Sequence, residues 1–233
     1  MIREAVLFAL TAAGTLALVG GATGGGEPYA ISDDFERGIA RGWALRQQES
    51  GVLDTVRAPG RAGMALRARA EPKGARVTKA ALIARTPPMM RGETVRVGFD
   101  LFVPAGTAPN SLQLVDVECA SCGEGGNPGV RLYLRRGRLR IDRSKIGIAR
   151  AWLDDAAPVL ANGRWYRVGL TLRLGAADGA ARVTLDGRTV LTGRGDTLLP
   201  GADHADRVQI GITANSNPSP ATLYLDNVAV SVR

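Results

Sequence analysis

Two stretches of the chain alternate between apolar and polar residues, and this alternation limits the fold more than any other feature. Every second side chain is apolar in residues 95–103, and the same spacing recurs in residues 166–174. The two apolar rows are Val95, Val97, Phe99, Leu101 and Val103, then Tyr166, Val168, Leu170, Leu172 and Leu174. Successive side chains of a strand point to opposite faces, so each row predicts a strand with one buried face.

Shorter segments of the same character follow one another between turns, and helical periodicity is nearly absent. These segments are Ser111–Cys119, Gly129–Leu134, Arg138–Asp142, Ala181–Asp186, Thr189–Thr192, Val208–Thr213 and Thr222–Val232. Asp186-Gly187, between two of them, is a strong two-residue hairpin signal. The pattern predicts an all-β fold, a two-sheet antiparallel sandwich over residues 31–233 that follows a flexible leader at 23–30.

Residues 1–22 have the features of a signal peptide. Arg3 gives a basic start, residues 5–18 are apolar, and Gly20-Gly21-Ala22 offers small residues for cleavage after Ala22. An uncleaved N-terminal anchor is the alternative, although the apolar run is shorter than the ~20 residues of a membrane span. No later segment is long and apolar enough to cross a bilayer, so we expect a periplasmic or extracellular protein.

The chain has two cysteines, Cys119 and Cys122, and one histidine, His204. A CxxC pair can be half of a zinc site, but no second pair exists, and a glycine-rich loop follows it in place of the helix of a thioredoxin motif. In an oxidising compartment we expect a local disulfide, with redox or metal chemistry as the weaker alternatives. His204 lies in the polar segment 201–206, which predicts a surface histidine in a loop.

The formal net charge is +8, and nearly all of the positive charge is arginine. Guanidinium groups pair bidentately with carboxylates and sulfates, so the charge favours an anionic partner. Codon bias in a GC-rich genome would give the same excess of arginine without any anionic partner. Nucleic acid is not favoured, because no DNA-binding or single-strand stacking motif accompanies the charge.

The segment 130–143 is the most suggestive binding surface. In strand parity Arg131 and Tyr133 share one face, and Arg138 and Arg140 share the corresponding face of the next strand. Together these side chains would offer cations for carboxylates and an aromatic ring for the apolar face of a sugar. A solvated strand face would show the same pattern.

The order of the strands at 163–168, 182–188 and 223–228 resembles the concanavalin A-like jelly-roll superfamily. Within it the sequence is similar to polysaccharide lyases of the alginate, glucuronan and heparin type. The resemblance implies a jelly-roll β-sandwich and an acidic polysaccharide as ligand. It also implies a binding role for Gln113, at the glutamine of the lyases' Gln-Ile-His strand.

Two positions depart from the lyase pattern. Val115 stands where those enzymes carry histidine, and Thr213 replaces the tyrosine of their Lys-x-Gly-x-Tyr strand. β-Elimination needs a base and an acid, so the resemblance implies the fold without its usual proton-transfer residues.

Two further sites rest on short patterns. Asp33 and Asp34 near the first strand, with Asp226 in the last, would supply oxygen ligands for a structural Ca²⁺ if the terminal strands pair. Acidic residues that form turns at strand ends would give the same pattern. No other cofactor is expected to be required. Trp152, in a loop-like segment, is a candidate for the rim of a sugar groove.

The sequence therefore predicts an exported, non-catalytic protein that binds an acidic polysaccharide. The predicted ligand contacts are Gln113, Arg131, Tyr133, Arg138, Arg140 and Trp152. One alternative is an active lyase with Tyr133 as its base, and another is a structural or protein-binding sandwich. A glucanase based on Asp116 and Glu118 is the least favoured reading, because one carboxylate pair at i, i+2 is a weak signal. The sequence does not predict the oligomeric state.

Overall fold

The computed structural model describes residues 28–122 and 127–233, which form an all-β sandwich of two antiparallel sheets. The predicted signal peptide and residues 23–27 of the leader lie outside the described residues. In the part that is described, no helix is both long enough and apolar enough to span a membrane. The predicted fold class is confirmed.

The first sheet has the strand order β13-β12-β11-β6-β15-β4-β3, and β1 pairs with β15 beside this path. Its strands are β1 (Tyr29–Asp33), β3 (Val52–Arg57), β4 (Met64–Ala70), β6 (Thr94–Phe102), β11 (Trp165–Arg173), β12 (Ala180–Leu185), β13 (Arg188–Arg194) and β15 (Ala221–Val232). The terminal strands are therefore neighbours, with Tyr29 opposite Val232.

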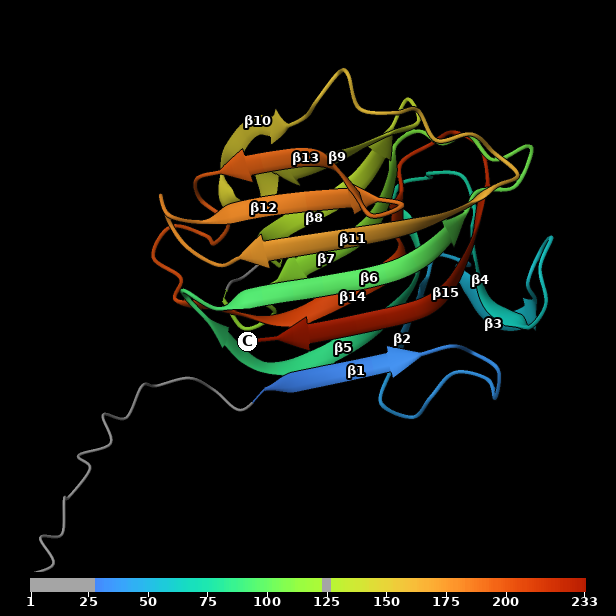
Figure 1. Ribbon diagram of the computed structural model, residues 1–233, viewed down its shortest axis with the longest axis horizontal. Helices are drawn as coiled ribbons and strands as arrows, with labels where there is room; N and C mark the ends of the chain where they lie inside the picture. Colours follow the sequence, from blue (N-terminus) through green and yellow to red (C-terminus); the bar gives the residue numbers. More distant parts are fainter. Residues whose placement is uncertain (1–27, 123–126) are drawn as a thin grey trace, which may run out of the picture.

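The second sheet has the order β10-β9-β8-β7-β14-β5-β2. Its strands are β2 (Ala44–Gln48), β5 (Thr78–Met90), β7 (Leu112–Glu118), β8 (Gly129–Arg135), β9 (Arg138–Arg143), β10 (Ile148–Trp152) and β14 (His204–Asn215), and a short 3-10 turn, η1 (Ser144–Ile146), follows β9. Figure 1 shows the first sheet in front of the second, with the strands of both running roughly across the view.

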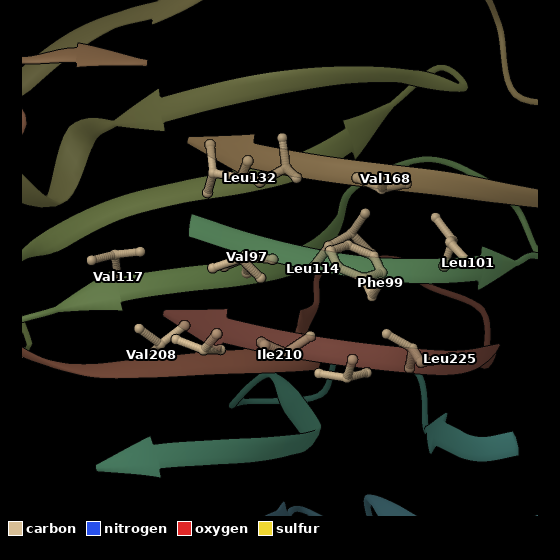
Figure 2. Close-up of a cluster of buried hydrophobic side chains, with 14 of the residues drawn as sticks. Val97, Phe99, Leu101, Leu114, Val117, Leu132, Val168, Val208, Ile210 and Leu225 are labelled. Carbon is tan, nitrogen blue, oxygen red and sulfur yellow. The ribbon is translucent and has the colours of Figure 1, made fainter. Parts of the chain in front are cut away.

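The core fills the space between the two sheets. Both apolar rows predicted from the alternation are buried there, on β6 and β11, and each of their ten residues is at most 6% exposed. Figure 2 shows Phe99 of β6 packed among residues of both sheets, including Leu114 of β7 and Leu225 of β15. Because the inward faces are apolar, the polar alternate positions of the second sheet must point away from the core.

The hairpin predicted at Asp186-Gly187 joins β12 and β13. Both residues have positive φ, 49° for Asp186 and 80° for Gly187, as a type I′ turn requires. The start of β14 differs from the expectation. His204 is the first residue of this strand and pairs with Met90, so the predicted polar loop is wrong at this point. Backbone pairing with β5 decides where this strand begins, and the polar side chains of residues 203–206 give no sequence pattern that would indicate a strand.

Candidate functional site

Four of the predicted ligand residues lie together on the outer face of the second sheet. On β8 and β9 the alternate residues Leu132 and Ile141 are fully buried in the core, which turns Tyr133 and Arg140 outward. Tyr133 is the register partner of Arg140 on one side and of Gln113 on the other. Arg131 points to the same side two positions along β8.

This row continues across the rest of the sheet. Ala214 of β14 is opposite Gln113. Lys79 of β5 lies between two residues that pair with β14, and it faces Gln48 of β2. Neighbouring strands are about 4.8 Å apart, so the row from Gln48 to Arg140 spans roughly 24 Å. We call this outer side the polar face; its members are Gln48, Lys79, Gln113, Asp116, Glu118, Arg131, Tyr133, Arg140, Asp142, Arg207 and Gln209.

Two buried carboxylates form the centre of the polar face. Asp116 and Glu118 are each 1% exposed although both point away from the core. Lys145 of η1 donates to both, at 3.4 Å from Asp116 Oδ2 and in closer contact with Glu118. Arg207 Nη2 lies 2.7 Å and Gln209 Nε2 2.6 Å from Glu118 Oε2. Glu118 therefore holds three neighbouring side chains in place.

The same acids neutralise part of the predicted arginine surface. Arg131 Nη1 lies 3.5 Å from Asp142 Oδ2, and its Nε lies 4.0 Å from Asp116 Oδ1. Arg140 contacts the exposed Asp155 at 3.3 Å, a weaker pairing because Asp155 is open to solvent. Arg140 is consequently the more available cation for a ligand.

The environment moves the pKa values of the two central acids apart. Burial raises the pKa of Asp116, and the neighbouring charge of Glu118 adds to this rise while Lys145 opposes it. Burial also penalises the charged form of Glu118, but Lys145 and Arg207 outweigh it and lower the pKa of Glu118 to about 2. Burial lowers the pKa of Lys79 on the same face.

Several buried polar atoms of this face have no hydrogen-bond partner among the described residues. They are Asp116 Oδ1, Arg131 Nε, Arg140 Nε and Gln209 Oε1. Buried polar groups are nearly always paired, so these atoms are exceptions, and because each is closed off from solvent they do not mark a ligand site.

Arg138 points outward like Arg140, two positions along β9, but its Nε already donates to the carbonyl of Ala157 at 2.9 Å. Trp152 lies apart from this group. Trp152 is the register partner of the inward-facing Ile141 and packs on the core. The guanidinium of Arg143 stacks over the indole of Trp152 in a cation–π contact, 4.0 Å from the ring centroid. The structure does not bring Trp152 to the polar face.

A β-bulge decides the direction of Val115. The register of β7 shifts between Gln113 and Val115, so Val115 faces Leu132 and is fully buried in the core. A bulge adds one residue to a strand and re-aims the side chains around it. The position that carries histidine in the lyase pattern therefore points into the sandwich, while Gln113 stays on the polar face.

The three acids predicted to hold Ca²⁺ lie near the paired ends of β1 and β15. Asp33 accepts hydrogen bonds from the backbone amides of Phe35 and Ala40 at 2.9 and 2.8 Å. Asp226 is paired with Arg61. In the described residues, Asp33, Asp34 and Asp226 do not converge on one point as metal ligands do. The calcium site stays a prediction, and the melting temperature with and without a calcium chelator tests it.

The predicted disulfide is present. Cys119 and Cys122 are bonded at the end of β7, with their Cα atoms 5.3 Å apart. His204, at the start of the neighbouring β14, lies beside them, with Nε2 3.6 Å from Cys119 Sγ. The sequence could not predict this contact, because the cysteine pair and the histidine are more than 80 residues apart in the chain.

Comparisons with known proteins support the fold. No protein-family model matches the sequence, and no curated protein matches it either. Solved structures do match, and they define the class: the jelly-roll β-sandwich that several polysaccharide lyases share. At identities of 13–18% these likenesses show the fold alone.

Three structures illustrate the match. The endo-β-1,4-glucuronan lyase of the fungus Trichoderma reesei has a TM-score of 0.67 at 17% identity, covering 87% of this chain and 94% of its own. The cellulose-induced protein Cip1 has 0.62 at 18% identity, covering 86% and 96%. The alginate lyase Aly36B has 0.56 at 13% identity, covering 86% and 96%.

Proposed function

We propose that this chain is an exported protein that binds an acidic polysaccharide along the polar face of its second sheet. One observation carries the proposal: Gln113, Tyr133 and Arg140 stand in register on three neighbouring strands. The row crosses the strands and is long enough for several sugar units in line. A phenol ring suits the apolar face of a sugar, and guanidinium and amide groups suit its carboxylates.

Two further observations support the same conclusion. The fold is shared with proteins named as glucuronan and alginate lyases, whose named substrates are acidic glycans. Arg140, whose ion pair is with the exposed Asp155, is the cation of the polar face that a uronate carboxylate would pair with.

Calorimetric titration with oligoglucuronate and oligoalginate tests the proposal. Arg140→Gln should weaken binding by about tenfold or more, since a hydrogen bond to a charged group contributes about 1.5–3 kcal/mol. Tyr133→Ala should weaken it by up to about tenfold, because it removes the ring that packs on the sugar. Arg182→Gln is the matched control, because Arg182 is an exposed arginine on the first sheet. Absence of binding at low salt would favour a structural or protein-binding sandwich. Equal losses in control and test variants would show a non-specific charge effect.

Catalysis by β-elimination is the second candidate, and the position of Lys79 on the polar face favours it. Burial lowers the pKa of its amine, which is the direction that a proton-accepting group needs. Lys79 lies in the same row as Tyr133, the base that the sequence suggested. Formation of an unsaturated uronate, followed by its ultraviolet absorbance, distinguishes the two functions. Lys79→Met and Tyr133→Phe should abolish turnover in a lyase. A glycan that binds and stays intact would leave binding as the function.

A further inference from the structure

Cys119, Cys122 and His204 converge where β7 ends and β14 begins, outside the row proposed for the glycan. Their ligand atoms all lie within 4.8 Å of one another. We propose that reduction of the Cys119–Cys122 disulfide creates a zinc site with two thiolates and the imidazole of His204 as ligands. This proposal is independent of the proposed glycan binding.

The distances fit a tetrahedral zinc ion. Zinc binds sulfur at about 2.3 Å and imidazole nitrogen at about 2.0 Å, which places two such ligand atoms roughly 3.5 Å apart. His204 Nε2 and Cys119 Sγ are 3.6 Å apart before any metal binds. The sulfur of Cys122 is on the same side, 3.9 Å from the carbonyl of His204. After reduction the two sulfurs must separate, and His204 Nε2 must exchange its 3.2 Å contact with Ser121 Oγ for the metal.

The histidine is already oriented for a metal. Its Nδ1 lies 2.6 Å from Asp203 Oδ1, which leaves Nε2 to face the sulfurs. Zinc-bound histidines typically donate their second ring nitrogen to a carboxylate in this way, which fixes the tautomer and the direction of the ring. Two thiolates and one imidazole are also donors that zinc prefers, with the fourth position open to water.

The turn that carries the cysteines is held by bonds other than the disulfide. Asp206 accepts hydrogen bonds from the amide of Ser121 at 3.1 Å and from its hydroxyl at 2.7 Å, and it also binds the amide of Ala120. Asp206 belongs to β14, as does His204. Reduction therefore leaves the CxxC turn attached to the strand that supplies the third ligand.

Ser121, His204 and Asp203 also contact one another as the members of a serine-hydrolase triad do. Ser121 Oγ lies 3.2 Å from His204 Nε2, and His204 Nδ1 lies 2.6 Å from Asp203 Oδ1. The surroundings argue against that chemistry. The Ser121 hydroxyl donates to Asp206, and the amides of Ala120 and Ser121 are bonded to the same carboxylate. Those two amides are not free to stabilise an oxyanion.

The chemistry balances with a dithiol reductant. The dithiol supplies two electrons and two protons, the protein disulfide becomes two thiols, and the reductant leaves as its own disulfide. Zinc binding then releases the two thiol protons.

The test is a zinc titration of the full chain, before and after anaerobic reduction and removal of the reductant, against a chromophoric chelator. The reduced chain should bind one equivalent and the oxidised chain none. Cys119→Ser, Cys122→Ser and His204→Gln should each lose the site. Asp203→Asn should weaken zinc binding 10–100-fold, because it acts through His204. Asp178→Asn, an exposed acid elsewhere, is its control. Cobalt in place of zinc adds a charge-transfer band from thiolate ligation.

Three results would overturn the proposal. The first is equal zinc binding by the reduced and oxidised chains. The second is unchanged affinity in His204→Gln, which would mean that the thiols bind zinc alone. The third is loss of the native circular dichroism spectrum on reduction, because the site depends on a turn that stays folded.

Discussion

Lys145, in the 3-10 turn after β9, donates to the buried carboxylate of Glu118 on β7, 27 residues earlier in the chain. Arg207 and Gln209 of β14 donate to the other oxygen of the same carboxylate. One acid therefore connects η1, β7 and β14 on the face that we propose binds the glycan. The charges of Glu118 and its partners largely cancel at the centre of the polar face, and Lys79 and Arg140 are the cations on either side of that centre.

Removal of the Glu118 charge should destabilise the fold strongly. In Glu118→Gln, Lys145 and Arg207 lose a buried partner, and breaking a buried ion pair from one side costs about 3 kcal/mol or more. Urea unfolding measures the change. Asp178→Asn, which breaks an exposed pair with Arg173, should change the free energy of unfolding little. A neutral result in Glu118→Gln would show that the network does not stabilise the sandwich.

Acid should remove the contribution of Glu118 in a defined range. Its folded-state pKa, about 2, is below the ordinary value of 4.5. A lowered carboxylate pKa adds stability that is complete above the ordinary value and is lost as the pH falls towards the folded value. The stability of the wild-type chain should therefore fall between pH 4.5 and 2 more steeply than that of Glu118→Gln. Parallel curves for the two proteins would contradict the assignment.

The turn between β12 and β13 should not tolerate a side chain at Gly187. This residue has a φ of 80°, in the left-handed region, where a Cβ costs about 1 kcal/mol. Gly187→Ala should lower the melting temperature. Gly74→Ala is the control, because a Cβ at Gly74 meets open space and its φ is not left-handed. Similar melting temperatures for the two variants would count against a type I′ turn.

Gly193 should be intolerant because of Trp152. A Cβ at Gly193 would lie 2.2 Å from the indole of Trp152, across the end of the sandwich where β13 and β10 lie near each other (Figure 1). Overpacking of this kind typically costs 1–3 kcal/mol, so we expect Gly193→Ala to unfold at lower denaturant concentration. An unaffected variant would mean that Trp152 is free to leave the core, as a residue at a groove rim would be.

Much of the fold follows from local pattern. The rows that begin at Val95 and Tyr166 predicted β6 and β11, because a strand with one buried face must alternate. Asp186-Gly187 predicted its hairpin, because few residue pairs adopt positive φ twice in succession. The disulfide followed from two cysteines three positions apart in a chain expected to be exported.

The candidate site was only partly visible in the sequence. Strand parity put Arg131 with Tyr133 and Arg138 with Arg140, but it could not show that Gln113 is the register partner of Tyr133. Lys79 and Lys145 carried no local sequence signal for the polar face, because their neighbours on that face come from strands that are distant in the chain.

By itself the sequence determined the all-β class, the core rows of β6 and β11, the Asp186-Gly187 turn and the disulfide, since each shows in residues close together in the chain. Only the tertiary structure decided which side chains from distant strands contact one another across the sheet. It set the bulge that turns Val115 inward, the burial of Asp116 and Glu118 beneath Lys145, and the meeting of His204 with the cysteine pair. Each depends on strand register and order, which pairing between distant segments sets and no local pattern records.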